Sequence, residues 1–208
     1  MSRAEDTRTR ILDAAERLVL EHGFGSTTID AVLDAAGSSK GAFFHHFSSK
    51  AELGRALVER YALADVHQLE AMMAVAEAAS DDPADQLIAF VAEFERLAAQ
   101  LPGATPGCLF VSFIYEADLV GPGIEEVVAA SIVTWRERIL DKLVRAADQH
   151  PGLAEVDLPS LADQIFVVFE GAFLLVRAMD DGDLLRRQLA HVRHYLELLF
   201  DRAPLPAA

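Results

Sequence analysis

Residues 38–50 concentrate the side chains with which this sequence could do chemistry on an anion. The thirteen residues read SSKGAFFHHFSSK and contain two lysines, two adjacent histidines, three phenylalanines and no acidic residue. The chain around them is acidic, with a formal net charge of -15 over 208 residues. Ammonium, imidazole and hydroxyl groups are the donors that phosphate oxygens accept in proteins. The segment therefore indicates the place where an anionic partner would meet this protein.

The composition and the distribution of charge bound the class of protein. Apolar residues make up 52% of the chain, which is enough for a folded core and excludes a disordered protein. Residues 1–50 hold six Lys or Arg and seven acidic residues, so the other 158 residues carry a formal charge of -14. The chain has one cysteine, no apolar run at its N-terminus and no uninterrupted apolar run of about 20 residues. These features predict a soluble, cytoplasmic protein without a membrane partner.

Short helices are expected to position the acid-free segment. Apolar periodicity and end signals predict three of them, over residues 8–22, 28–36 and 39–47. Thr27 and Asp30 have the spacing of a capping box at the start of the second helix. Ser38 and Ser39 are expected to cap the third helix. Two short helices joined by a glycine-containing turn predict a helix-turn-helix.

The rest of the chain also has helical patterns. A second capping box, formed by Ser49 and Glu52, predicts the start of a long helix. Proline at the first helical position and glycine-rich breaks delimit the helices that follow. Six helices are predicted, over residues 50–79, 83–101, 108–119, 124–149, 159–179 and 183–202. No strand pattern stands out, so the sequence predicts an all-α protein in which three short helices precede a six-helix bundle.

The N-terminal quarter resembles a known family. The stretch TRTRILDAAERLVLEHGFGSTTIDAVLDAAGSSKGAFFHHFSSKAEL is similar, without gaps over residues 7–53, to the N-terminal domain of the Tet-repressor-like (TetR) family of bacterial transcriptional regulators. The resemblance implies a three-helix DNA-binding domain over residues 1–52 and an effector-binding and dimerisation domain over residues 53–208. It implies a regulator, expected to be a repressor, that a small-molecule effector releases from a palindromic operator.

The resemblance also implies which side chains face the bases of the DNA. In this family the third helix enters the major groove, where Lys40, Gly41 and Ala42 would face base edges. The Lys40 ammonium can donate to guanine, and the Ala42 methyl group can touch thymine. Gly41 lets the backbone approach the DNA closely. These three residues are expected to read the operator sequence.

A second set of residues is expected to hold the phosphate backbone. The resemblance places Thr28, Ser38, Ser39, His45, His46 and Lys50 on phosphates. The family usually has tyrosine at the position of Phe44, and the phenylalanine lacks the hydroxyl donor. We therefore expect somewhat weaker anchoring of the backbone at Phe44.

The larger domain is expected to bind an effector and to dimerise. Four aromatic residues, Phe94, Phe113, Trp135 and Phe169, are candidates for lining the effector pocket. Glu116 and Arg177 are candidate polar groups, because both interrupt apolar runs. Cys108 is a further candidate for the effector site, as a reactive thiol at a helix start, and the alternative is a buried apolar side chain. The last two helices are apolar over a wide arc, which the resemblance assigns to a homodimer interface.

Two other classes of protein are alternatives to the regulator. A helical-bundle enzyme would need a nucleophile with a base, a metal cluster or a phosphate loop, and the sequence presents none of these. Adjacent His45 and His46 point about 100° apart on a helix, which argues against a shared metal ion. A protein-interaction module with a vestigial helix-turn-helix is the other alternative. The sequence is therefore predicted to encode a regulator that is not an enzyme and has no cofactor.

Overall fold

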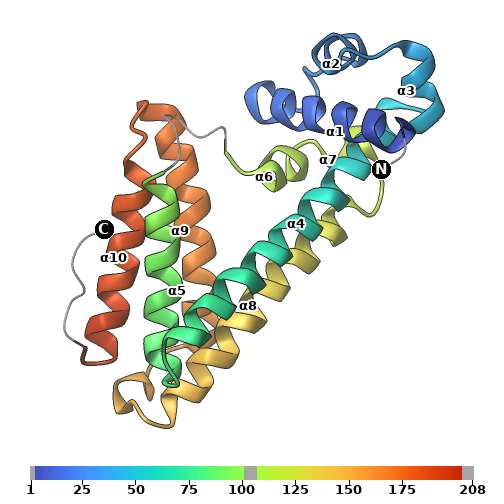
Figure 1. Ribbon diagram of the computed structural model, residues 1–208. Coiled ribbons are helices and arrows are strands. Elements are labelled where there is room, and N and C mark those ends of the chain that lie inside the picture. The colour runs from blue at the N-terminus through green and yellow to red at the C-terminus, as the bar shows by residue number, and fades with distance from the viewer. Residues whose placement is uncertain (1–2, 101–106, 203–208) are drawn as a thin grey trace. The chain divides into compact units, whose positions relative to one another are not determined.

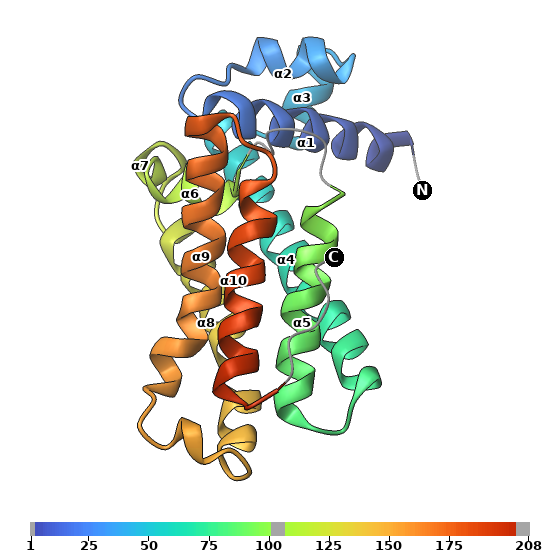
Figure 2. The same cartoon turned by 90° about the vertical axis from the view of Figure 1, so that its left-hand side faces the viewer.

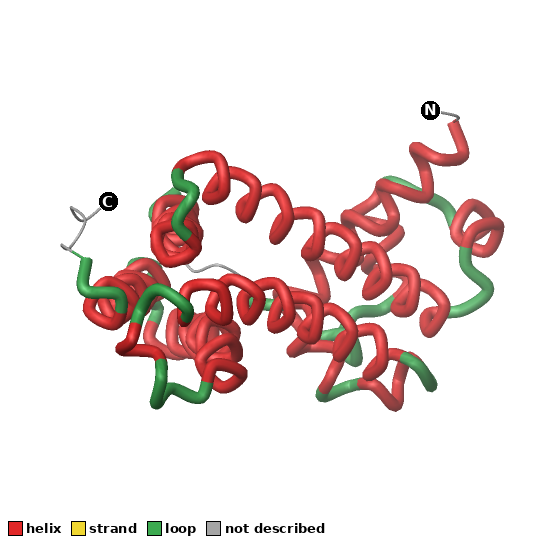
Figure 3. Tube along the Cα trace, turned by 90° about the horizontal axis from the view of Figure 1, so that it is seen from below, coloured by secondary structure: helices red, strands yellow, loops and turns green. Residues whose placement is uncertain are grey.

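The structure, a computed structural model, describes residues 3–100 and 107–202. Every regular element in those two ranges is a helix, so the predicted all-α class is confirmed (Figure 3). The α-helices are α1 (Arg3–His22), α2 (Ile29–Ala36), α3 (Lys40–His46), α4 (Lys50–Ala79), α5 (Pro83–Ala98), α6 (Leu109–Ile114), α7 (Ala117–Val120), α8 (Ile124–Ala147), α9 (Leu158–Met179) and α10 (Leu184–Leu199), with a short 3-10 helix at Pro151–Leu153.

Most helix ends lie close to the predicted ones, and α4 has both of its predicted ends. The single helix predicted over residues 108–119 is wrong. Its backbone leaves the helical region at Glu116, whose φ of -124° and ψ of 22° separate α6 from α7. This break raises the number of α-helices after α3 from the predicted six to seven in the described ranges. The predicted end of α5 at Leu101 lies outside the described residues.

The chain divides into two compact units. The first unit comprises Met1–Ala64 and Pro106–Ala130, and the second comprises Asp65–Thr105 and Ser131–Ala208. The first unit therefore contains α6 and α7 in addition to α1–α3 and the start of α4 (Figure 1). These compact units differ from the two functional domains predicted from the sequence, because a segment from the middle of the chain packs with the N-terminal helices.

The first unit is built around the amphipathic helix α1. Its apolar side chains at Ile11, Leu12 and Ala15 are at most 1% exposed. Helix α1 contacts α2, α3 and α6, which cover that apolar face. Phe43 and Phe47, at 0% and 1% exposure, complete the core beneath α3. Burying side chains of this size contributes roughly 1.5–3 kcal/mol each, which fixes the short helices in place.

Side-chain caps set the start of α2 and of α3. The hydroxyl oxygen of Thr28 accepts a bond of 3.1 Å from the amide of Ala31, and that of Ser39 accepts a bond of 3.2 Å from Ala42. The predicted capping box of Thr27 and Asp30 is wrong. The buried Thr27 hydroxyl instead donates to the carbonyl of Gly23 at 2.8 Å, because Thr27 still belongs to the preceding turn. Each cap satisfies a backbone amide that the first helical turn leaves unpaired.

The second unit is a bundle in which α10 lies beside both α5 and α9 (Figure 2). Its core contains Leu87, Val91, Leu189 and Leu196, all at most 2% exposed. Their spacing along α5 and α10 follows the helical period, so the two helices face each other with apolar stripes. These periodic apolar stripes can be recognised in the sequence, which is why the sequence predicts a helical bundle.

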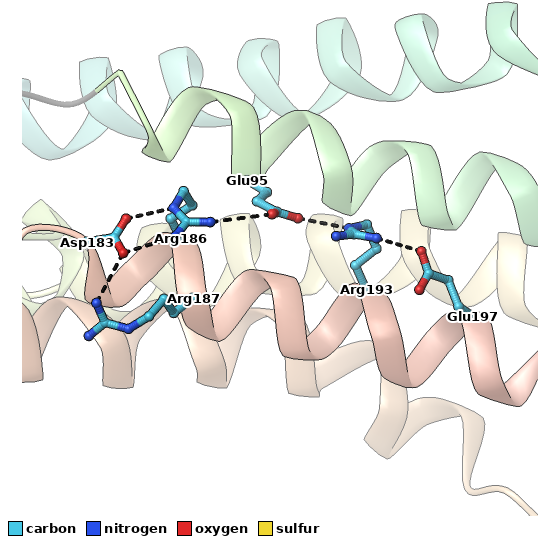
Figure 4. A network of polar contacts seen from close by, with 6 residues as sticks. All are labelled: Glu95, Asp183, Arg186, Arg187, Arg193 and Glu197. Carbon is cyan, nitrogen blue, oxygen red and sulfur yellow. Dashed lines mark hydrogen bonds and ion pairs between the residues drawn. The ribbon is translucent and has the colours of Figure 1, made fainter. Parts of the chain in front are cut away.

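A charged network lies between α5 and α10 inside this bundle (Figure 4). The Arg193 guanidinium donates to Glu95 at 2.8 Å and to Glu197 at 2.6 Å. All three side chains are at most 7% exposed. The network continues toward solvent through Arg186, which bonds Asp183 at 2.6 Å and approaches Glu95 to 3.9 Å. Buried charges of opposite sign can be accommodated because each satisfies the other's hydrogen-bonding groups.

Candidate DNA interface and effector site

The residues predicted to contact DNA cluster on the start of α2, on α3 and on the start of α4. Helix α3 is short and is held from below by Phe43 and Phe47, so its outer side chains face solvent. Six of the ten predicted residues are exposed, namely Thr28, Ser39, Lys40, Gly41, Phe44 and His45. The other four, Ser38, Ala42, His46 and Lys50, are half-buried. The structure thus brings the predicted set together in one compact unit.

Lys40, which is predicted to contact a DNA base, forms an exposed ion pair with Asp30. Its ammonium lies 3.0 Å from the Asp30 carboxylate, and about two-thirds of each side chain is exposed, at 67% and 69%. Ion pairs this exposed contribute about 0–1 kcal/mol. A base edge or a phosphate can therefore replace Asp30 at little cost.

Phe44 is an exposed aromatic side chain on α3. Its ring is 55% exposed and meets the buried ring of Phe43 edge-on, with centroids 5.2 Å apart. A ring in this position offers an apolar contact but no hydrogen-bond donor. The prediction of weaker backbone anchoring at Phe44 stays a prediction, although the exposure of the ring leaves it available to a partner.

Two residues predicted to contact phosphate, Ser38 and Lys50, are partly occupied within the protein: the Ser38 hydroxyl is buried, and the Lys50 ammonium already has a hydrogen-bond acceptor. The hydroxyl oxygen of Ser38 is buried and has no hydrogen-bond partner within the described ranges. The Lys50 ammonium donates to the carbonyl of Gly25 at 3.0 Å and lies 4.6 Å above the centre of the Phe24 ring. Burial lowers the pKa of Lys50, and the negative charge of Glu116 opposes that shift. Lys50 is therefore held in place before any DNA binds.

The residues predicted to bind the effector fall into different parts of the structure. Phe94, Trp135 and Phe169 come together in the second unit, with ring centroids 5.5 Å apart for Phe94 and Trp135 and 5.0 Å apart for Phe94 and Phe169. They are contributed by α5, α8 and α9. Arg177 is exposed in the last turn of α9. The three rings form an aromatic cluster that is mostly buried, with Phe94 and Trp135 at 4% and 6% exposure.

Three of the predicted effector residues belong to the first unit instead. Phe113 is fully buried, and its ring lies 5.1 Å from that of Phe24. The Glu116 carboxylate accepts hydrogen bonds from the backbone amides of Phe24 and Gly25. Cys108 is half-buried at the start of α6, with its sulfur 3.9 Å from the Tyr61 hydroxyl. Phe113 and Glu116 pack against the turn that follows α1, and Cys108 contacts α4, so all three belong to the first unit, whereas the aromatic cluster belongs to the second.

Asp65 is a polar group beside the aromatic cluster that the sequence analysis missed. Its Oδ2 atom accepts a bond of 2.8 Å from the indole of Trp135 and one of 2.9 Å from the Ser131 hydroxyl. Burial raises the pKa of Asp65, and these two bonds oppose the shift. A sequence signal existed, because a buried indole N–H needs an acceptor and Asp65 is an acid within the predicted long helix.

Helices α9 and α10 present apolar side chains to solvent in the second unit. The exposed residues are Val167, Leu174, Leu175 and Met179 on α9 and Tyr195 and Leu198 on α10, with exposed fractions between 42% and 69%. Among the described helices, α9 is also the one long and apolar enough to cross a membrane, with 28% of its most apolar window buried. A single such helix is weak evidence for a membrane span, since core helices of soluble proteins share these features.

Comparison with protein families gives two matches that together span both compact units. Residues 11–57 match the model of "Bacterial regulatory proteins, tetR family". Residues 83–192 match the model described as "Tetracyclin repressor-like, C-terminal domain". The first match covers the helices that carry the predicted DNA contacts, and the second covers the aromatic cluster and most of α10.

Individual relatives agree with these matches. The transcriptional regulator AcuR of Cereibacter sphaeroides is 30% identical over 160 residues, which are 74% of this chain and 68% of AcuR. The regulator TtgR of Pseudomonas putida is 41% identical over 56 residues, and the chain spans only 27% of its length. The crystal structure of a TetR transcriptional regulator from Chloroflexus aurantiacus is 30% identical with a TM-score of 0.75, covering 94% of this chain and 96% of that one.

Proposed function

Because the chain belongs to the tetR family of bacterial regulatory proteins, we propose that it is a dimeric repressor that a small-molecule effector releases from a palindromic operator. The observation that carries this proposal is the capped, exposed helix α3, at the start of an acid-free segment that lies within the matched residues 11–57. In an acidic protein, such a face is where contact with phosphates is least opposed. The protein would act by binding, without a cofactor, in the cytoplasm where its operator lies.

The proposed contacts divide between base reading and backbone holding. Lys40, Gly41 and Ala42 would read base edges in the major groove. Lys50 and the hydroxyls and imidazoles around α2 and α3 would hold phosphates. The exposed ion pair of Lys40 with Asp30 supports this division, because Lys40 can exchange its partner whereas Lys50 is fixed.

A second copy of the chain would cover the exposed apolar side chains of α9 and α10. Four helices, two from each subunit, would then bury a continuous apolar interface. A two-fold dimer carries two α3 helices, which can occupy successive major grooves about 34–36 Å apart. The operator would accordingly be a near-palindrome.

The effector would bind at the aromatic cluster of Phe94, Trp135 and Phe169. These rings favour an apolar or aromatic ligand, and Asp65 is the nearby polar group that would orient it. Effector and operator would prefer different conformations of the protein, so binding of one would weaken binding of the other. Helix α4 would carry this change, because it starts in the first unit and ends in the second.

Selection of duplexes from a random 30-base-pair library, followed by salt titrations, tests the DNA-binding proposal. We expect the full chain to enrich a near-palindromic sequence. Lys50→Ala should weaken binding to every duplex and lower the salt slope by about 0.9 for each protomer. Lys40→Ala should mainly relax the sequence preference. Arg145→Ala is the matched control, because it removes a half-exposed arginine side chain of α8 in the second unit. This variant should change neither the salt slope nor the sequence preference.

Two outcomes would count against the proposal. Failure to enrich any sequence would reject sequence-specific DNA binding. If Lys40→Ala and Lys50→Ala changed affinity, specificity and salt slope alike, the assignment of separate roles to the two lysines would be rejected.

A further inference from the structure

The turn between α1 and α2 is held by a carboxylate from a distant part of the chain. Glu116, at the break between α6 and α7, lies 91 residues beyond Gly25. Its Oε2 atom accepts bonds from the amides of Phe24 at 2.6 Å and Gly25 at 3.1 Å, and its Oε1 atom accepts from Gly25 at 3.2 Å. Hydrogen bonds to an ionised group are about twice as strong as neutral ones. The turn thus has a strong attachment to the α6–α7 segment.

The turn is shaped to admit this carboxylate. A Cβ atom at Gly25 would lie 2.9 Å from Oε1 of Glu116 and 3.3 Å from the Leu119 side chain. Gly23 has a φ of +84°, in the left-handed region that favours glycine. The first contact is closer than real Cβ atoms approach oxygen, so only glycine fits position 25 while Glu116 keeps its place.

The same residue, Gly25, is held at its carbonyl by Lys50. The Lys50 ammonium donates to the carbonyl of Gly25 at 3.0 Å, while Glu116 accepts from the amide of that residue. The charge of Glu116 also acts on Lys50, since it opposes the lowering of the Lys50 pKa by burial. The position of Lys50 therefore depends on the position of the turn, and the turn depends on Glu116.

The Phe24 ring fastens the turn to the rest of the unit. The ring is 2% exposed, lies 5.1 Å from the ring of Phe113 in α6, and carries the Lys50 ammonium on its face. Gly54 of α4 makes room for the ring, because a Cβ atom there would come within 2.7 Å of it. Helix α6 and Glu116 thus fix both the side chain and the backbone of Phe24.

We propose that Glu116 is a positioning residue for DNA binding. By holding the amides of Phe24 and Gly25, it fixes the turn that leads into the α2 cap and places Lys50 for its phosphate. This inference rests on the proposed function, because it takes Lys50 as a phosphate contact. It gives Glu116 a role in the DNA-binding unit, in place of the effector-binding role predicted from the sequence.

The test compares Glu116→Ala, Glu116→Gln and the wild-type full chain on a duplex selected from the random library by the wild type. Alanine removes both acceptors. Glutamine retains one carbonyl oxygen, which can accept from both amides as Oε2 does. Asp118→Ala is the matched control, because it removes an exposed carboxylate of α7 two residues away. Thermal unfolding of each variant ensures that binding is compared between folded proteins.

We expect Glu116→Ala to weaken binding about tenfold or more and to lower the salt slope by about 0.9 for each protomer, as loss of one phosphate contact does. The amides of Phe24 and Gly25 should also exchange hydrogen faster in the free protein. Glu116→Gln should restore most of the affinity and the full salt slope, and Asp118→Ala should bind as the wild type does. Adding Glu116→Ala to Lys50→Ala should cause little further loss, since both changes act through one contact.

A folded Glu116→Ala variant with wild-type affinity and salt slope would overturn the inference. If Glu116→Ala does not fold, Glu116→Gln decides: wild-type salt slope and protected amides support the positioning role, and a reduced slope with protected amides overturns it. A wild-type protein that selects no duplex at all would reject the proposed function, and the inference would fall with it.

Discussion

Replacing Arg193 by methionine tests how far the second unit depends on its buried charges. The Arg193 side chain is 7% exposed and separates the carboxylates of Glu95 and Glu197, each 1% exposed. Methionine fills a similar apolar volume but donates no hydrogen bond. The variant therefore leaves two carboxylates in the bundle without the cation that both of them bond (Figure 4).

The expected loss of stability is large compared with the stability of an ordinary domain. Removing one partner from a buried ion pair costs about 3–5 kcal/mol, against a total unfolding free energy of about 5–15 kcal/mol. For a chain of this length, 1 kcal/mol corresponds to about 2–4 °C in Tm, so Tm should fall by roughly 6–20 °C. The exposed pair of Arg187 with Asp181, at 45% and 35% exposure, should be worth less than about 1 kcal/mol.

Urea unfolding followed by circular dichroism measures this difference. Arg187→Met is the control, because it removes the same kind of cation from the same helix at an exposed position. The triple variant Glu95→Leu, Arg193→Met and Glu197→Leu removes the charges together and should recover most of the stability, since apolar replacements of buried ion pairs are often neutral. If Arg193→Met lost no more stability than Arg187→Met, or if the triple variant were the least stable, the reasoning from buried charge would be refuted.

Three further substitutions have defined outcomes. Burial raises the pKa of Asp65, so the folded protein binds the Asp65 proton more tightly than the unfolded chain does. The stabilisation that this proton gives is present below the ordinary carboxyl pKa and is lost as the pH rises through the raised pKa. As the pH rises above the ordinary carboxyl pKa, the stability of Asp65→Asn relative to the wild type should increase in urea titrations, and a difference that stays constant with pH would contradict this. Leu174→Arg should yield a monomer in sedimentation equilibrium whereas Leu63→Arg, at a similarly exposed leucine of α4, should not; unchanged dimers would exclude this part of α9 from the interface. Phe44→Tyr should tighten binding to the selected duplex roughly two- to tenfold by adding one hydrogen bond, and unchanged affinity would show that the ring does not reach a phosphate.

The sequence predicted the helices well because their starts and stops are local. A serine three residues before a glutamate defines the start of α4, and Ser49 does cap the amide of Glu52 at 3.1 Å. At the start of α2, the spacing of Thr27 and Asp30 predicted a cap at Thr27, whereas Thr28 is the residue that caps the helix. Thr27 belongs to the preceding turn, where its buried hydroxyl donates to the carbonyl of Gly23.

The polar partners of the candidate sites could not be predicted in the same way. Glu116 interrupts an apolar run. A polar group in such a run indicates that it has a specific hydrogen-bond partner, but the sequence does not identify that partner. Its partners are the backbone amides of Gly25 and Phe24, 91 and 92 residues away in the chain. The three rings of the aromatic cluster lie on three helices, and Phe113 carries the same apolar signal but packs on Phe24. Hydrophobic periodicity identifies buried faces, whereas which faces meet depends on the fold.

Two carboxylates, those of Asp30 and Glu116, act on the two lysines of the acid-free segment in different ways. The Asp30 carboxylate is exposed and meets Lys40 at one distance of 3.0 Å, so an incoming phosphate or base edge can displace it. The Glu116 carboxylate is bonded by two backbone amides, and its charge is directed at the turn beneath Lys50. An acid within residues 38–50 would repel phosphate, but an acid supplied by the α6–α7 segment can hold the turn from behind. With the proposed contacts, Lys40 would change partners on binding, while Lys50 would meet a phosphate from a position that is already fixed.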